Sequence, residues 1–238
     1  FKIAKNLLRK GVKNILIEKP AAIEIREINF LNYLSNKFNA GVYVAYNRRC
    51  YSSVITAKKL IEKDGGIKSF YFDFTEWSHE IVTLKLPKIV KERWIYSNSS
   101  HVLDLAFYLG GLPKKLNAMI RDNTSWHPQG SIFAGCGISS TGALFNYGAN
   151  WNSAGRWKLE FSTTKRKFIF EPIEELKVVK KGTTKIENIN LDNHEYDLKY
   201  KPGIFLQTKK FLVGKTEELC SINKHSNNMK IYKKIAGY

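Results

Sequence analysis

The sequence predicts the later part of a parallel α/β domain, followed by an α+β domain with a large, mostly antiparallel open sheet. Helical and strand patterns alternate over the first 48 residues, and from about residue 68 onward a run of strands follows with few helices between them. A chain of 238 residues with 43% hydrophobic residues is long enough to bury such cores. We therefore expect an N-terminal unit, residues 1–48, and a C-terminal unit, residues 49–238.

The N-terminal unit is predicted to alternate helices with strands. Apolar residues within 3–8 repeat at helical spacing before Gly11, which suits a helix C-cap. Residues 25–38 carry apolar side chains at steps of three and four, which indicates a second helix. The β-branched runs at 13–17 and 41–47 predict one strand before this helix and one after it. Short connections in this order are typical of parallel strands.

The C-terminal unit is predicted to be rich in strands. Phe70, Phe72 and Phe74 alternate with polar residues, which indicates a strand with one apolar face. Similar patterns predict further strands at 116–121, 131–137, 142–151, 156–163, 166–171 and 175–180. We expect helices near 54–61, from His101 to Leu109 and over 203–213, and a hairpin turn at 138–142.

The charge balance raises nucleic acid as a partner. The net charge is +18, and dense Lys and Arg surfaces neutralise phosphates. Only eight of the 39 basic residues are Arg, however, and the lysines are spread along the whole chain. Arg is the residue that recognises phosphates and base edges with a planar fork. A nucleic-acid-binding protein is therefore the less favoured alternative, and the same positive field would favour an anionic substrate or cofactor.

The cysteines and the apolar runs bear on location. Cys50, Cys136 and Cys220 are odd in number and form no CxxC pair, which favours a reducing, cytoplasmic setting. Lys5 and Arg9 interrupt the first apolar stretch, and no later run reaches the roughly 18 residues of a membrane span. We expect a cytoplasmic protein without a membrane partner. The histidines stand apart from one another, so no metal site is expected.

Glu18, Lys19 and Pro20 follow the first predicted strand. Ligands of open α/β sheets bind at the carboxyl ends of the strands, so Lys19 can point into a site there. The alternative is a strand terminator with two solvated charges. Asn47, Arg48 and Arg49 follow the second strand, where Arg can clamp a phosphate or carboxylate. A structural ion pair at a domain junction is equally compatible with these arginines.

His101 opens a predicted helix in the segment SNSSHVLDLAFYLGG. Ser99 or Ser100 can cap this helix, and a histidine at a helix start is a common structural hydrogen-bonding residue as well as a possible catalyst. Asp104 lies three residues further on, where it could orient the imidazole or help to cap the helix. The glycines at 135, 137 and 142 lack the spacing and the following helix of a dinucleotide fingerprint.

Four segments, taken in order, resemble the landmarks of the Gfo/Idh/MocA family of oxidoreductases. They are ILIEKPAA (15–22), VAYNRRCYSSVITAKKLIEKDGGIKSF (44–70), SSHVLDLAFYLGG (99–111) and GALFNYGANW (142–151). The segment GIFLQTKKFLVGK (203–215) resembles the closing helix of that family, which packs back toward the nucleotide domain. The resemblance covers nearly the whole chain.

This resemblance implies a Rossmann domain that binds NAD or NADP and an open sheet that commonly forms a homodimer or homotetramer. It implies hydride transfer between the cofactor and a hydroxyl-bearing carbon of a sugar or sugar nucleotide. Lys19 and His101 would be the catalytic pair, within a few ångströms of each other. Glu18, Lys19 and Pro20 would contact the cofactor, while Asn47, Arg48 and Asp104 would contact the substrate.

The sequence departs from the family in two places. The family often has Asp four residues before the catalytic histidine, and this chain has Ser97 there. The glycine-rich turn that cradles the dinucleotide phosphates is missing, and Phe1 already lies within a later helix of that domain, so we expect the earlier part of the domain to precede Phe1. A non-catalytic binding or scaffold protein derived from the same family is therefore the main alternative to an enzyme.

Overall fold

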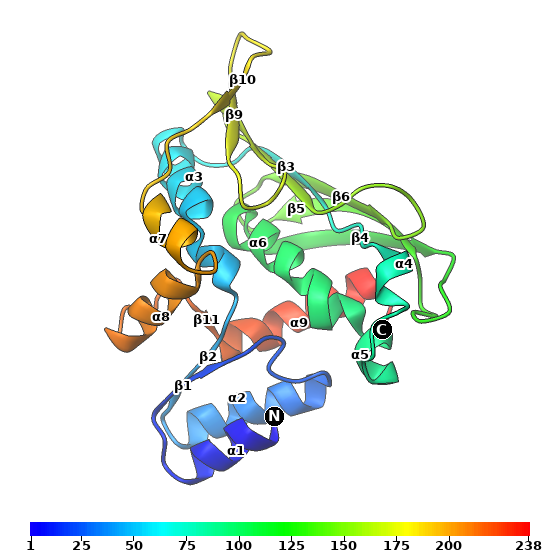
Figure 1. Ribbon diagram of the computed structural model, residues 1–238, viewed down its shortest axis with the longest axis vertical. Coiled ribbons are helices and arrows are strands. Elements are labelled where there is room, and N and C mark those ends of the chain that lie inside the picture. The colour runs from blue at the N-terminus through cyan, green and yellow to red at the C-terminus, as the bar shows by residue number, and fades with distance from the viewer.

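Two β-sheets organise the chain (Figure 1). The computed structural model describes residues 1–238. The smaller sheet has the strand order β1-β2-β11, and the larger has the order β10-β9-β8-β7-β3-β6-β5-β4. This combination of a parallel strand pair with a large, mostly antiparallel sheet confirms the predicted fold class.

The N-terminal unit has the predicted alternation of helices and strands. Its elements are α1 (Lys2–Arg9), β1 (Asn14–Ile17), α2 (Ile25–Lys37) and β2 (Gly41–Val44). β1 and β2 are parallel, with Ile15 opposite Val42. Their carboxyl ends therefore lie at the same edge, and the segments that follow Ile17 and Val44 meet there.

The short helix η1 spans the boundary between the two units, and the C-terminal unit ends with a helix that returns to the smaller sheet. In order, its elements are η1 (Asn47–Cys50), α3 (Ser52–Lys63), β3 (Ser69–Asp73), α4 (Ser78–Ile81), α5 (Lys88–Glu92), η2 (Ile95–Ser99), α6 (Ser100–Gly110), β4 (Pro113–Arg121), β5 (Ile132–Ser139), β6 (Leu144–Asn150), β7 (Lys158–Ser162), β8 (Arg166–Phe170), β9 (Lys177–Lys180), β10 (Ile186–Asn188), α7 (His194–Lys199), α8 (Ile204–Leu212), β11 (Cys220–Ser221) and α9 (Ile222–Ala236). The predicted hairpin at 138–142 joins the antiparallel strands β5 and β6.

β3 lies in the middle of the larger sheet, parallel to β6 and antiparallel to β7. The alternation seen in its sequence places Phe70 and Phe72 on the face that α6 covers, where the rings of Phe72 and Phe107 lie 5.4 Å apart. Gly110 ends α6 beside this cluster, because a Cβ atom there would lie 2.5 Å from the Phe70 ring. Aromatic packing thus fixes α6, and with it His101, against the sheet.

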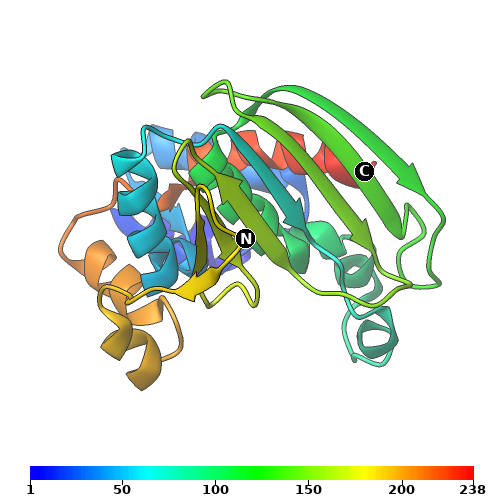
Figure 2. The same ribbon diagram turned by 90° about the horizontal axis from the view of Figure 1, so that it is seen from above.

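The opposite face of the larger sheet is uncovered, and Figure 2 shows α6 and α9 on the far side. Met119 and Leu144 are 63% and 61% exposed on this face. Glu160, which forms ion pairs with two lysines, lies on the same face further along the sheet. Lys115 and Arg121 lie on the same side of β4 as Met119, so the exposed apolar residues at this end stand among charged ones. Phe70 and Phe72 of β3 face inward, whereas Tyr71 lies on the uncovered face.

The C-terminal segment was not predicted. β11 pairs antiparallel with β2, and α9 packs along α2, so the last residues complete the smaller sheet. α8 lies within the range predicted for the closing helix, but it contacts η1 and α7, and α9 is the helix that packs on the N-terminal unit. No helix of the chain is both long enough and apolar enough to cross a membrane.

Candidate active site

Lys19 lies in the turn after β1. Its ammonium donates a hydrogen bond to the backbone carbonyl of Ser97 in η2, which belongs to the C-terminal unit. Burial of the ammonium, and next the charge of Arg48, lower the pKa of Lys19 to about 8, while Glu76 and Glu18 act in the opposite direction. The side chain therefore loses its proton much closer to neutral pH than an exposed lysine does.

His101 lies in the first turn of α6, four residues after Ser97. Its side chain is buried, and its Nδ1 atom has no hydrogen-bond partner. Burial, followed by the charges of Arg48 and Lys19, holds the pKa of His101 well below its usual value. The imidazole is therefore neutral at physiological pH. The structure brings Lys19 to the helical segment that leads into His101, and a catalytic role of the pair stays a prediction.

η2 is a π-helix that runs directly into α6. Such wide turns occur frequently at functional sites, because the looser winding frees backbone groups that a regular α-helix would occupy. Here the Ser97 carbonyl receives the Lys19 ammonium. The family that the sequence resembles often has an Asp side chain at the position of Ser97. This chain offers the backbone oxygen of Ser97 there instead.

Trp157 forms one wall of the site. Its ring centre lies 6.3 Å from that of His101, 4.9 Å from the Arg48 guanidinium and 4.6 Å from the Arg156 guanidinium. The Nε atom of Arg48 is buried without a hydrogen-bond partner. A cavity of about 310 Å³ adjoins these side chains and is also lined by Glu174. The unpaired Arg48 donor beside this cavity suits a hydroxyl-bearing ligand.

Glu76 was not identified from the sequence. It is 1% exposed and accepts hydrogen bonds from Ser99 Oγ at 2.7 Å, Asn98 Nδ2 at 3.0 Å and Arg156 Nη1 at 2.5 Å. Burial raises the pKa of Glu76, and the facing Arg156 opposes that rise. Glu76 thus holds the two residues that follow Ser97. An acidic residue directly after a strand with one apolar face was the available signal.

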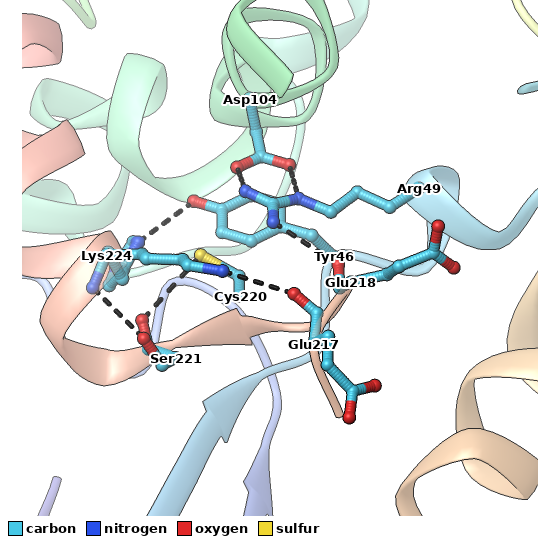
Figure 3. Close-up of polar contacts among 9 residues, drawn as sticks. Tyr46, Arg49, Asp104, Glu217, Glu218, Cys220, Ser221 and Lys224 are labelled. Atoms are coloured by element: carbon cyan, nitrogen blue, oxygen red, sulfur yellow. Dashed lines mark hydrogen bonds and ion pairs between the residues drawn. The ribbon is translucent and has the colours of Figure 1, made fainter. Parts of the chain in front are cut away.

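Asp104 corrects one prediction. It does not orient His101, because its two carboxylate oxygens accept hydrogen bonds from Arg49 at 2.6 and 2.7 Å (Figure 3). Both side chains are almost fully buried. Burial alone would lower the pKa of Arg49, but the Asp104 carboxylate raises it well above its usual value. Because its carboxylate is buried against Arg49, Asp104 is also poorly placed for the predicted contact with substrate. The junction ion pair that the sequence left open is Arg49–Asp104.

Asn47 and Pro20 make structural contacts close to the site. The Asn47 amide donates to the Pro202 carbonyl at 2.9 Å, and the Pro20 carbonyl lies 2.9 Å from His225 Nε2. Glu18 is exposed. A substrate contact of Asn47 and cofactor contacts of Glu18 and Pro20 stay predictions.

The residues present fit only one end of a dinucleotide. The carboxyl ends of β1 and β2 lead to Lys19 and Arg48, and the unpaired buried atoms of His101 and Arg48 lie in the same site, which suits a nicotinamide ring with its substrate. The segment between β1 and α2 contains no glycine, and its last residue, Glu24, is the N-cap of α2. A carboxylate at that position would repel a pyrophosphate.

No protein-family model and no curated protein sequence matches this chain. Solved structures do. Levoglucosan dehydrogenase, in complex with NADH and levoglucosan, superposes with a TM-score of 0.79 at 21% identity over 99% of this chain and 74% of its own. An inositol dehydrogenase homolog from Azotobacter vinelandii, complexed with NADH and myo-inositol, superposes with a TM-score of 0.74 at 15% identity, over 99% of this chain and 72% of its own. UDP-N-acetylglucosamine 3-dehydrogenase from Acidithiobacillus ferrooxidans superposes with a TM-score of 0.74 at 13% identity, over 99% of this chain and 73% of its own. At these identities the likeness establishes the fold.

Removing Asp104 should destabilise the chain strongly. Asp104→Ala leaves the Arg49 guanidinium buried without a counter-charge, and we expect a loss of about 3–5 kcal/mol in the free energy of unfolding. The double variant Arg49→Met with Asp104→Leu should recover most of that loss. Glu92→Ala, which removes a partner of the exposed Lys88, should change stability by less than about 0.5 kcal/mol. Urea unfolding measures all three, and equal losses for Asp104→Ala and Glu92→Ala would contradict this role.

Replacing Glu76 by Gln should lower the pKa of Lys19. Because the Glu76 carboxylate favours the protonated ammonium, its removal should move the value down from about 8, by up to about one unit. Titration of the lysine ε-carbon signals by NMR measures this, with the Lys19 signal assigned from Lys19→Met. Glu160→Gln, on the uncovered sheet face, is the control that should leave Lys19 unchanged. An unchanged or higher pKa in Glu76→Gln would refute the coupling.

Proposed function

We propose that this chain carries the substrate site of a nicotinamide-dependent oxidoreductase that transfers a hydride between NAD or NADP and a hydroxyl-bearing carbon of a sugar or sugar derivative. The observation that carries the proposal is the hydrogen bond from Lys19, at the carboxyl end of β1, to Ser97, one helical turn before His101. The fold shared with three sugar-type dehydrogenases, two of them determined with NADH, supports it.

Oxidation of an alcohol requires a group that takes the hydroxyl proton and a donor that holds the developing alkoxide. Lys19 has a pKa of about 8, close to physiological pH, so its Nζ atom suits proton transfer in both directions. His101 has a pKa well below its usual value, which makes it a poor proton store. We therefore assign the proton transfer to Lys19 and the positioning of the substrate hydroxyl to the neutral imidazole of His101.

The remaining side chains bind the substrate and enclose it. Arg48, with its unpaired Nε atom, donates to a substrate oxygen, and the Trp157 ring holds the Arg48 guanidinium in place. A bound nicotinamide supplies the hydride acceptor or donor, and the turn of Glu18, Lys19 and Pro20 would adjoin it. The buried position of His101 limits the access of water, so charge interactions within the site are weakly screened.

A non-catalytic scaffold is the second candidate. Such a protein would keep both sheets of this fold without binding a dinucleotide. Titration of the full-length protein with NADH and NADPH separates the two candidates, because a scaffold should bind neither. A nucleic-acid-binding function has no support of this kind, since many basic residues, such as Lys158 and Arg166, are already paired with carboxylates.

We further propose a homodimer or homotetramer in the cytoplasm. The end of the uncovered sheet face that carries the exposed Met119 and Leu144 is the surface that a second copy would cover. Its neighbour Cys136 is exposed and unpaired, whereas the other two cysteines are buried, which suits a reducing compartment.

Substitution of the catalytic pair should abolish turnover and leave the fold intact. On the full-length protein, Lys19→Met and His101→Ala should each lower the rate of sugar oxidation by roughly a hundredfold or more. NADH affinity should change little, because the phosphates contribute most of it. Steady-state kinetics and calorimetry measure both quantities. If His101 served only as a helix cap, His101→Ala would cost about 1 kcal/mol of stability and spare turnover.

Charge on the uncovered face should separate the subunits. Leu144→Lys and Met119→Lys place charges where two apolar surfaces would meet, so we expect the assembly to dissociate to monomers. Light scattering at micromolar concentration measures the mass. Ile3→Lys, at a position on α1 that is 78% exposed, is the control and should leave the mass unchanged. A monomeric parent protein would remove the basis for the proposed assembly.

A further inference from the structure

A second, larger cavity lies beside the site and takes no part in the chemistry proposed above. Its volume is about 800 Å³, and it is lined by residues of α4 and its flanks, 77–82, and of two loops, 124–126 and 151–155. None of its twelve lining residues is Asp, Glu, Lys or Arg. Because charged residues make up 25% of the chain, an uncharged lining of this size points to an uncharged ligand.

The cavity combines fixed indole rings with polar groups. Trp126 and Trp151 stack with ring centres 5.2 Å apart and planes at 9°. Trp126 Nε1 donates to Ser78 Oγ at 2.9 Å, and Trp77 Nε1 donates to the Gly155 carbonyl at 3.0 Å. Trp77 is 42% exposed although its ring is held in place. A rigid aromatic face costs little conformational entropy when a ligand packs on it.

Most of the remaining lining residues carry uncharged hydrogen-bonding groups, among them His79, Thr124, Ser125, Asn152 and Ser153. An exposed indole beside hydroxyl and amide groups is suited to a pyranose ring, whose C–H face packs on the aromatic ring while its hydroxyls bond around the edge. A purely apolar ligand would leave these hydroxyl and amide groups without partners.

One side chain joins this cavity to the candidate active site. The Arg156 guanidinium lies 4.7 Å from the Trp77 ring and 4.6 Å from the Trp157 ring, and it donates to Glu76 at 2.5 Å. Trp157 in turn adjoins His101. The two spaces are therefore neighbours across Arg156, whose charge is already balanced by a buried carboxylate.

We propose that this cavity binds a second, uncharged sugar ring of the substrate, so that the enzyme acts on a glycoside of at least two rings. The inference rests on the proposed function, which places the reacting ring at Lys19 and His101. A nucleoside diphosphate in the same cavity would bring two negative charges into a lining without a cation. Desolvating those charges would cost more than the neutral groups return.

Calorimetry with defined sugars tests this inference. The probes are glucose, galactose and inositol, the neutral disaccharides cellobiose, maltose, lactose and sucrose, and UDP-glucose. We expect at least one disaccharide to bind roughly tenfold tighter than the single-ring sugars, the scale of one aromatic contact. Trp77→Ala should abolish that advantage, and Trp77→Phe should retain most of it. Tyr33→Ala, at an exposed aromatic residue of α2, should have no effect.

The outcomes separate this inference from the proposed function. If single-ring sugars bind and no disaccharide binds tighter, or if the disaccharide advantage survives in a folded Trp77→Ala variant, the second-ring site is refuted and the proposed function stands. Tightest binding of UDP-glucose, insensitive to Trp77, refutes it equally. If none of these sugars binds, both the site and the proposed sugar oxidoreductase activity are refuted. Thermal unfolding of each variant confirms that it is folded.

Discussion

The ion pair between Arg49 and Asp104 couples the two sheets of this protein. Arg49 lies in η1, directly after the smaller sheet, and Asp104 lies in α6, which packs on the larger one. Two hydrogen bonds between planar groups fix orientation as well as distance. Since His101 lies on the same helix as Asp104 and Arg48 precedes Arg49, the pair sets how the neutral imidazole and the arginine of the site face one another.

Much of the fold could be predicted from local pattern. Alternation at Phe70, Phe72 and Phe74 predicted β3 because that strand is covered on one face only. α9 was not predicted because its sequence is rich in lysine and three of its buried positions hold polar residues, His225, Ser226 and Asn228. Their hydrogen-bond partners, among them the Pro20 carbonyl, come from distant parts of the chain. The spacing of apolar residues along α9 therefore does not indicate that these polar residues are buried.

The candidate site shows the same division. The position of Lys19 after a strand and of His101 at a helix start could be recognised from neighbouring residues. The partner of Asp104 could not, because Arg49 is 55 positions away and the nearby His101 offered a plausible local alternative. Glu76 acts through Asn98, Ser99 and Arg156, and only the folded chain brings these four together. The electrostatic setting of Lys19 is thus a tertiary property, whereas its location is a local one.

The antiparallel pairing of β11 with β2 bears on how the chain is made. A ribosome releases Gly41–Val44 long before Cys220 and Ser221 exist, so β2 has an unpaired edge throughout most of synthesis. Contacts between such distant segments form slowly, because a long loop must close before they contribute any stability. An open edge during that interval can pair with other nascent chains. Pairing of Cys220 and Ser221 with β2 thus closes an edge that is open to such contacts until β11 forms.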